Sequence, residues 1–480
     1  MKPVKRVLTT MAIVLPLAAV IGLGSIAFYG SRPAFPEQFS VSGWKVGGMA
    51  YADFPQQLSR QVALLNSVPV QLVSDRKEIP SRSQKLQDLG LHVDDREIQD
   101  LLRELTEGNV LDRARSRWKL RHYEAKIGLS IEADRLDKKL QSLWPELYAV
   151  QPVSAQRIVT PDDRVQYKAG QPALRIDASG LKADIERQIR RIDPKRAENP
   201  LSIQVPFRLQ EPEVTEKMLR DQHVDRLLTQ FSTPLNQSSP GRKHNVRSTA
   251  ATLHEVILKP GEIFDYAPII EQTGIKFGFR EAPVILNGKL VPGVGGGICQ
   301  VSTTLYSAVL RAGLEIVERR NHSLPISYAP LGQDATFSTG FINFRFRNDT
   351  KAHLLIRTQM SDTALTIKLF GSIPSDTTYE IMSNTVETIQ PPVKYVHNPG
   401  LKTGEQVELS PGKQGFVVDT YRIKKQGGRE VSREKISRDR YTPQARVVAS
   451  NTGVLKPPAE PAPPQNNVIE DGVTRIGKTP

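Results

Sequence analysis

The stretch Pro292-Gly-Val-Gly-Gly-Gly-Ile-Cys-Gln-Val-Ser-Thr-Thr-Leu-Tyr306 decides how its part of the chain folds. A run of glycines leads into Cys299, which is the only cysteine of the chain. Apolar residues then recur at helical spacing, and Gly313 supplies a stop signal. The pattern predicts a helix that begins next to Cys299. Its thiol therefore lies at a helix N-terminus, where free amides and the helix dipole favour a thiolate.

Two further residues extend this pattern to a possible catalytic site. His322 follows Cys299 by twenty-three residues, and Asp334 follows twelve residues later. Cysteine at a helix start, then histidine, then an acid is the chain order of papain-like and transglutaminase-like nucleophilic sites. We expect Cys299 to be a nucleophile with a lowered pKa, His322 its general base, and Asp334 the group that orients the imidazole. The alternatives are that Cys299 is a small buried hydrophobe, that His322 is a surface loop histidine and that Asp334 is a turn residue.

The residues around Cys299 indicate where a substrate would bind. Glycines let the backbone approach a carbonyl closely, and amides next to the thiol can donate to an oxyanion. For Ser302 the alternative to substrate binding is a helix cap, and for Arg280 it is a solvated surface charge. The predicted substrate-binding residues are Gly295, Gly296, Gly297, Gln300, Ser302 and Arg280.

The same stretch resembles the VanW family. The likeness rests on Gly295 to Tyr306, on Ala312 to Tyr328 and on Gly332-Gln-Asp-Ala-Thr336, within a match from about Asn245 to Ile356. The resemblance implies a bacterial envelope protein, and some members occur in vancomycin-resistance gene clusters. His254 departs from the pattern, where a small polar residue is expected.

A metal site is the remaining alternative for these side chains. Cys299, His322 and Asp334, with His254, are chemically suitable ligands, but no His-x3-His or Cys-x2-Cys spacing accompanies them. We therefore predict no metal and no cofactor. The sequence also contains no phosphate loop or dinucleotide fingerprint in a convincing context.

Composition limits the class of protein. The chain has 480 residues and a net charge of +14, so it should form two to four domains with an affinity for anionic partners. Nucleic acid, anionic lipid and cell-wall polymer all fit that charge. Without a finger, basic zipper or RNA-stacking motif, we expect no nucleic-acid partner.

The N-terminus predicts a membrane anchor. Residues 7–29 carry no charge and are long enough to span a bilayer, and Lys2, Lys5 and Arg6 precede them. The N-terminus should then stay in the cytoplasm and the bulk of the chain outside the cell. The alternative is a cleaved signal peptide with a small-residue site at Ser25-Ile-Ala27.

We predict an α+β multidomain protein. The expected parts are a stub and anchor (1–30), an α+β region (31–212), a helical connector (213–241), a VanW-like domain (242–375), a β-rich module (376–452) and a disordered Pro-rich tail (453–480). The 31–212 region resembles a duplicated peptidoglycan-binding domain, with a generic spacer as the alternative. The β-rich module resembles the G-five module of cell-wall proteins, and the Cys299 domain has a papain-like layout.

Two functions remain open at this level. One is an anchored enzyme that uses a Cys-His-Asp site for acyl transfer or amide hydrolysis on peptidoglycan stem peptides, with a possible link to glycopeptide resistance. The other is a non-catalytic scaffold whose basic surface grips anionic wall polymers, with a structural Cys299. Reactivity of the thiol distinguishes them.

Overall fold

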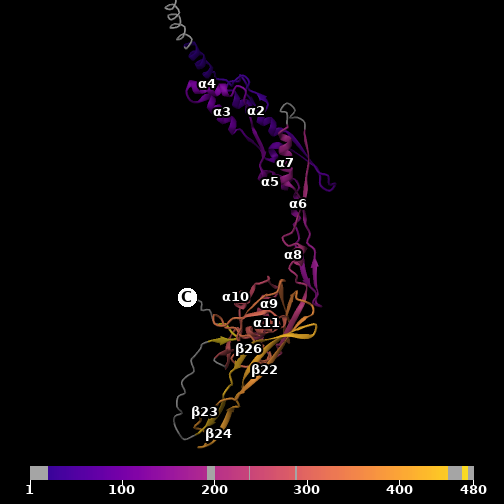
Figure 1. Cartoon of the computed structure of the whole chain (residues 1–480), viewed down its shortest axis with the longest axis vertical. Helices are drawn as coiled ribbons and strands as arrows, with labels where there is room; N and C mark the ends of the chain where they lie inside the picture. The colour runs from indigo at the N-terminus through magenta and orange to yellow at the C-terminus, as the bar shows by residue number, and fades with distance from the viewer. Residues whose placement is uncertain (1–19, 192–199, 237, 287–288, 452–467, 474–480) are drawn as a thin grey trace, which may run out of the picture. The chain divides into compact units, whose positions relative to one another are not determined.

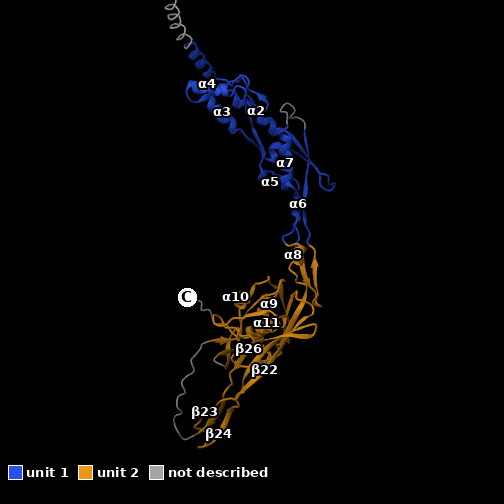
Figure 2. Cartoon of the chain, in the orientation of Figure 1, with its two compact units in different colours: residues 1–154, 170–213 blue, residues 155–169, 214–480 orange. Residues whose placement is uncertain are grey.

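The structure of the chain is a computed structural model that describes residues 20–191, 200–236, 238–286, 289–451 and 468–473. It divides into two compact units (Figure 2). Unit 1 holds residues 1–154 and 170–213, and unit 2 holds residues 155–169 and 214–480. The fold is therefore mixed α+β and multidomain, as the sequence predicts.

Unit 1 contains two hydrophobic clusters. One joins β3, α5, α7 and β11, and the other joins α2 and α3 with the first strands. The elements of unit 1 are β1 (Ser40–Val41), β2 (Trp44–Lys45), α2 (Phe54–Ser67), β3 (Pro69–Val73), β4 (Arg82–Lys85), the 3₁₀ turn Leu86–Leu89, β5 (Leu91–Asp94), α3 (Arg96–Thr106), α4 (Val110–Lys119), β6 (Glu124–Ala125), β7 (Gly128–Ile131), α5 (Ala133–Leu143), α6 (Pro145–Ala149), β10 (Ala173–Ile176), α7 (Ala178–Ile189), β11 (Leu201–Gln204) and β12 (Phe207–Gln210).

The sequence predicts that the 31–212 region is duplicated, but the two expected copies do not form separate modules. β3, from the first copy, pairs in parallel with β11 from the second, between Val70 and Leu201 at one end of the ladder and Val73 and Gln204 at the other. Parallel strands need a long crossover, which the intervening helices provide. The two copies consequently share one core.

Most of the predicted span at 7–29 lies outside the described residues. Residues 20–30 are helical. Within the part of the chain that the structure describes, we find no helix of sufficient length and apolar character to cross a membrane.

Unit 2 is built around an antiparallel sheet with strand order β13-β21-β20-β14, against which α11 packs. Its elements are β8 (Gln156–Val159), β9 (Val165–Lys168), α8 (Glu216–Arg220), β13 (Arg226–Pro234), α9 (Pro240–Leu253), β14 (Val256–Leu258), β15 (Ile263–Asp265), α10 (Tyr266–Phe277), β16 (Glu281–Leu286), β17 (Lys289–Val294), α11 (Ile298–Ala312), β18 (Glu315–Glu318), β19 (Arg345–Arg347), β20 (Leu354–Met360), β21 (Ala364–Gly371), β22 (Thr377–Ile389), β23 (Val393–His397), β24 (Gln406–Ser410), β25 (Gly415–Gln426), β26 (Arg429–Tyr441), β27 (Arg446–Ser450) and β28 (Ile469–Glu470).

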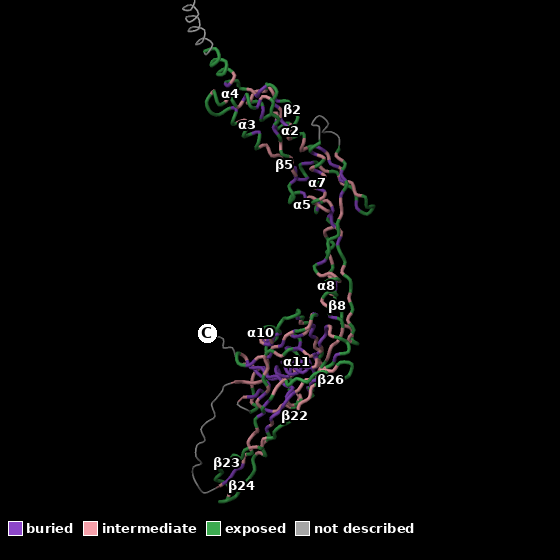
Figure 3. The backbone as a smooth tube through the Cα atoms, in the orientation of Figure 1, coloured by how far each residue is buried: buried purple, intermediate pink, exposed green. Residues whose placement is uncertain are grey.

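Helix α11 is the centre of unit 2. Apart from the half-buried Arg311, all of its residues are buried, and buried backbone gathers around it in Figure 3. A helix buried on every side must find partners for its polar side chains. Ser302 and Thr303 donate to the carbonyl of Ala335, and Ser307 donates to that of Gln333. These bonds hold the segment that carries Asp334 along the side of the helix.

The structure differs from the sequence prediction at two places. The predicted helical connector contains the short α8 and the first two residues of α9, and its longest element is the nine-residue strand β13, because Arg226–Pro234 pairs along β21. In the predicted disordered tail, residues 468–473 are described and include β28, which pairs with β16. The rest of that tail, 453–467 and 474–480, lies outside the described residues.

The end of α11 generates a stability prediction. Gly313 has φ +79° as the C-cap, and a Cβ there would lie 2.2 Å from the ring of Tyr379. We expect Gly313→Ala to lower the free energy of unfolding of unit 2 by about 2–4 kcal/mol, from left-handed strain plus overpacking. Tyrosine near-UV circular dichroism in urea measures this change.

Gly261→Ala is the matched control. Gly261 has the same φ of +79° but open space around its Cβ position, so it should lose only about 1 kcal/mol. All three tryptophans, Trp44, Trp118 and Trp144, lie in unit 1, so the unfolding curve from tryptophan fluorescence should not move. Equal losses in the two variants would contradict the packing argument.

Candidate active site

A sharp turn of glycines delivers Cys299 to the start of α11. Gly295 and Gly297 have φ +89° and +110°, and a Cβ on Gly296 would lie 2.4 Å from the carbonyl oxygen of Pro283. The buried Asn245 braces this turn, since its Nδ2 donates to the carbonyl of Gly296 at 3.0 Å. The predicted sharp bend is present, and each of the three positions requires glycine for conformation or space.

The Cys299 thiol lies in the interior and touches the backbone of the neighbouring segment. The residue has no exposed surface. Its Sγ accepts a hydrogen bond from the amide of Phe337 at 3.0 Å, and Thr336 Oγ1 lies 3.6 Å away. An amide that donates to sulfur favours a thiolate, so this contact would stabilise the charged nucleophile.

His322 and Asp334 meet beside the thiol, as the sequence predicts. His322 Nδ1 lies 2.7 Å from Asp334 Oδ2, and the amide of His322 donates to the same oxygen at 2.7 Å. Neither side chain is exposed. One carboxylate oxygen thus fixes both the backbone and the ring of His322, which leaves Nε2 as the free ring nitrogen.

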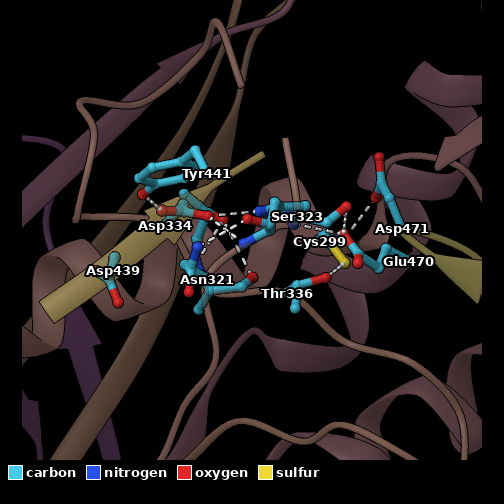
Figure 4. Close-up of polar contacts among 12 residues, drawn as sticks. Cys299, Asn321, Ser323, Asp334, Thr336, Asp439, Tyr441, Glu470 and Asp471 are labelled. Carbon is cyan, nitrogen blue, oxygen red and sulfur yellow. Dashed lines mark hydrogen bonds and ion pairs between the residues drawn. The ribbon is translucent and has the colours of Figure 1, made fainter. Parts of the chain in front are cut away.

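The second oxygen of Asp334 is held by groups that the sequence analysis did not identify (Figure 4). Tyr441 Oη donates to Asp334 Oδ1 at 2.5 Å, and the Arg319 guanidinium lies 3.4 Å from the same atom. Arg319 also pairs with Asp439 at 2.6 Å. All of these side chains are almost fully buried, so the network carries its charges without water.

This network sets the ionisation of the pair. Burial opposes charge on His322, but the Asp334 carboxylate and the nearby Cys299 outweigh it and raise the imidazole pKa well above its ordinary value. Burial likewise opposes charge on Asp334, yet His322 and Arg319 hold the pKa of that carboxyl below its usual range. We infer a charged imidazolium–carboxylate pair at neutral pH.

The free nitrogen of His322 has no partner in the described residues. Nε2 is buried and makes no hydrogen bond, although Cys299 lies close enough to influence its pKa. Catalytic hydrogen bonds are often unmade in a structure without substrate. Nε2 is therefore the atom available for proton transfer at the thiol.

Helix α11 is capped by a distant residue. The amides of Gly297 and Cys299 both donate to Asp471 Oδ1, at 3.0 and 2.8 Å. Asp471 Oδ2 pairs with Arg242 at 2.9 Å. Figure 4 shows Asp471 on one side of Cys299, with Asp334 and Tyr441 on the other. Two amides that converge on one oxygen beside a nucleophile form the arrangement of an oxyanion hole.

Burial and, after it, the Asp471 carboxylate explain why the prediction of a lowered thiol pKa is wrong. Burial raises the pKa of Cys299, and the nearby Asp471 carboxylate raises it further, against the smaller lowering by His322. The helix-terminal amides that would stabilise a thiolate are already bonded to this carboxylate. Burial and the Asp471 carboxylate therefore both favour the protonated thiol.

Three residues that the sequence predicts to bind substrate make other contacts in the structure. Gln300 is buried, and its amide bonds Thr233 and the carbonyl of Pro234, which ties α11 to β13. Ser302 is also buried and does not cap the helix. The side chain of Arg280 is exposed, and its backbone bonds Asn245.

The described residues contain no group of side chains suited to the alternative of a metal site. Among them, no three His, Cys, Asp or Glu side chains are placed to hold an ion. His254 instead bonds Thr358 through Nδ1.

Several site residues escaped sequence reasoning. Arg242, Asn245 and Tyr441 have no local motif, and Asp471 lies beyond a proline-rich stretch that resembles a tail. Only the Asp-Gly pair at 471–472, a turn signal, hinted at order there.

Two known families match parts of unit 2. Residues 241–370 match the family described as VanW like protein, and residues 381–453 match the G5 domain. The chain carries a VanW-like domain followed by a G5 domain. Asp439 and Tyr441 of the network thus belong to the G5 segment, while Cys299, His322 and Asp334 belong to the VanW-like one.

Two curated relatives match part of the chain. The uncharacterized protein YoaR of Bacillus subtilis is 38% identical over 176 residues, which are 36% of this chain and 57% of that protein. The vancomycin B-type resistance protein VanW of Enterococcus faecalis is 28% identical over 151 residues, or 30% of this chain and 55% of that protein. The chain thus spans about half the length of each.

A solved structure, the IgA1 protease G5 domain, is 27% identical, with a TM-score of 0.13, over 17% of this chain and 98% of that one.

The ionisation of His322 is directly testable. Its imidazolium contributes stability that is complete below about pH 6.5 and is lost as the pH rises through the raised folded pKa. Asp334→Asn removes the carboxylate, so we expect the pKa of His322 to fall by about one unit or more, as for a lost buried ion pair. Imidazole NMR signals against pH measure it.

Asp362→Asn is the control for this titration, because the Asp362 side chain is 93% exposed. Its His322 titration should match that of the wild type. An unchanged His322 pKa in Asp334→Asn would contradict the pairing.

Proposed function

We propose that this protein is a cell-envelope enzyme that uses Cys299, His322 and Asp334 for acyl transfer or amide hydrolysis on peptidoglycan peptides. The observation that carries the proposal is the buried His322–Asp334 pair, at 2.7 Å, with its free Nε2 beside the only thiol of the chain. A purely structural cysteine requires no oriented imidazole or converging amides next to it.

The first step would open an amide of the wall peptide. The Cys299 thiol first loses its proton to solvent, because His322 already carries one. The thiolate sulfur then attacks the carbonyl carbon, and the resulting oxyanion accepts from the amides of Gly297 and Cys299. The C–N bond then breaks, and the imidazolium of His322 gives its Nε2 proton to the leaving amine. The products of this step are a thioester on Cys299, a free amine and a neutral His322.

The second step would release the acyl group. An acceptor amine or a water attacks the thioester carbon, Nε2 of His322 takes the proton of that nucleophile, and the C–S bond breaks to regenerate the thiolate–imidazolium pair. Asp334 holds the ring in one orientation during both steps.

The envelope setting is part of the proposal. The G5 domain, the net charge of +14 and the apolar stretch at 7–29 support a membrane-anchored protein with its bulk outside the cell, in contact with anionic wall polymer. The likeness to the vancomycin resistance protein VanW supports a link to glycopeptide resistance. We propose that unit 1 contributes to peptidoglycan binding.

The experiment that tests the function is trapping of an acyl-enzyme. The wild-type chain, incubated with purified peptidoglycan fragments, should gain the mass of an acyl group on Cys299 and release either joined or shortened stem peptides. Cys299→Ser should reduce turnover by about a thousandfold or more, because a hydroxyl is a much weaker nucleophile at neutral pH. Intact-protein and fragment mass spectrometry measure both.

The control is Cys299→Ala, which should still bind sacculi in a pull-down. If neither adduct nor altered fragments form with any wall preparation while Cys299→Ala retains wall binding, the non-catalytic scaffold is the better description.

A further inference from the structure

The oxyanion hole formed by the amides of Gly297 and Cys299 is occupied by the chain itself. Residues 469–473 run along the VanW-like domain as an added strand, in which Ile469 and Glu470 pair antiparallel with Leu286 and Ile285 of β16. The next residue, Asp471, puts one carboxylate oxygen on the amides of Gly297 and Cys299.

Each residue of this segment touches a different part of the site. Glu470 Oε2 accepts from the amide and hydroxyl of Ser323, the neighbour of His322, at 2.9 and 3.1 Å. Gly472 bridges to Ser338, the residue after Phe337. The amide of Val473 donates to the carbonyl of Val294 at 2.9 Å. The segment therefore lies across the nucleophile from the histidine side to the glycine turn.

The fit is close and demands particular residues. A Cβ on Gly472 would lie 2.7 Å from Val284 and 3.1 Å from the carbonyl oxygen of Val294. Asp471 adopts φ +59°, an unusual conformation for a residue other than glycine. This conformation persists because the carboxylate is buried between two amides and a guanidinium.

These contacts reproduce how an extended peptide binds an enzyme. Addition of a strand to a sheet edge supplies affinity through backbone bonds, while pockets for side chains supply specificity. The oxygen of Asp471 lies where the oxyanion of a substrate would be bound. Arg242 pairs with the other oxygen of Asp471, and it lies close enough to Cys299 to interact with a charge on the thiol.

We propose that residues 469–473 are an internal occupant of the acyl-binding site, and that the same site takes an extended peptide with a carboxylate held by Arg242. The substrate half of this statement rests on the proposed function. While the segment is bound it covers the amides needed by the oxyanion and keeps a negative charge beside the thiol. It must therefore leave before Cys299 can react.

The first experiment measures alkylation of Cys299 by iodoacetamide against pH in the full chain. Because the chain has one cysteine, every label reports this thiol. Asp471→Asn removes the charge, and Gly472→Val unseats the strand without altering any charge. We expect each to accelerate alkylation at pH 7.5 about tenfold or more, the change in thiolate fraction for one pKa unit.

Glu408→Gln is the matched control, because it also removes a carboxylate that pairs with an arginine, Arg446, on the G5 domain. Its alkylation rate should equal that of the wild type. Wild-type rates in both Asp471→Asn and Gly472→Val would overturn the inference. Acceleration in Gly472→Val alone would overturn the role of the carboxylate.

A second measurement separates opening of the site from unfolding. A synthetic hexapeptide with the sequence of residues 468–473, added to Gly472→Val, should restore slow alkylation, and the peptide with asparagine in place of Asp471 should do so much less. Equal effects of the two peptides would overturn the acidic-peptide site, and so would a lack of protection in a Gly472→Val variant whose near-UV circular dichroism matches that of the wild type. An unfolded variant would lose that spectrum and would not recover protection.

The outcomes also separate this inference from the proposed function. Faster alkylation without any acyl-enzyme would overturn the function and leave the internal occupant standing. Acyl-enzyme formation at equal rates in the wild type and Gly472→Val would overturn the occupant and leave the function standing.

Discussion

Unit 2 depends on one constraint, which is that α11 is buried on nearly all sides while it carries several hydroxyl side chains. In the interior most polar groups are hydrogen-bonded, since an unpaired one costs about 1–3 kcal/mol. Ser302, Thr303 and Ser307 satisfy this requirement with carbonyls of residues 333–335. The same bonds place Asp334 beside His322. The polar face of the helix is thus what assembles the candidate site.

Charge is distributed around the thiol in two opposing groups. On one side Asp334, supported by Tyr441 and Arg319, keeps His322 charged. On the other side Asp471 bonds the helix-terminal amides and adds to the effect of burial, which raises the pKa of the thiol. The two carboxylates thus act on Cys299 in opposite senses, since Asp334 favours the charged His322 that lowers the thiol pKa and Asp471 raises it.

The sequence predicted the parts of this site that follow local rules. The period of apolar residues and the stop at Gly313 gave α11, and the order of Cys299, His322 and Asp334 gave the cluster. What it could not give were contacts made across long separations in the chain, such as those of Tyr441 and Asp471, which no spacing encodes. The prediction of a lowered thiol pKa is wrong because Cys299 is fully buried and because Asp471 lies beside it. The predicted connector helix is wrong because pairing with β21 outweighed local propensity.

The ion pair between Arg319 and Asp439 has a consequence for how such proteins diversify. The two partners belong to segments that match different families, yet each is nearly fully buried. A recombination event that exchanged the G5 segment for one without an acid at this position would strand a guanidinium in the interior and release Tyr441 from Asp334. The buried ion pair thus ties the two segments together electrostatically, so exchange of one without an acid at this position would be costly.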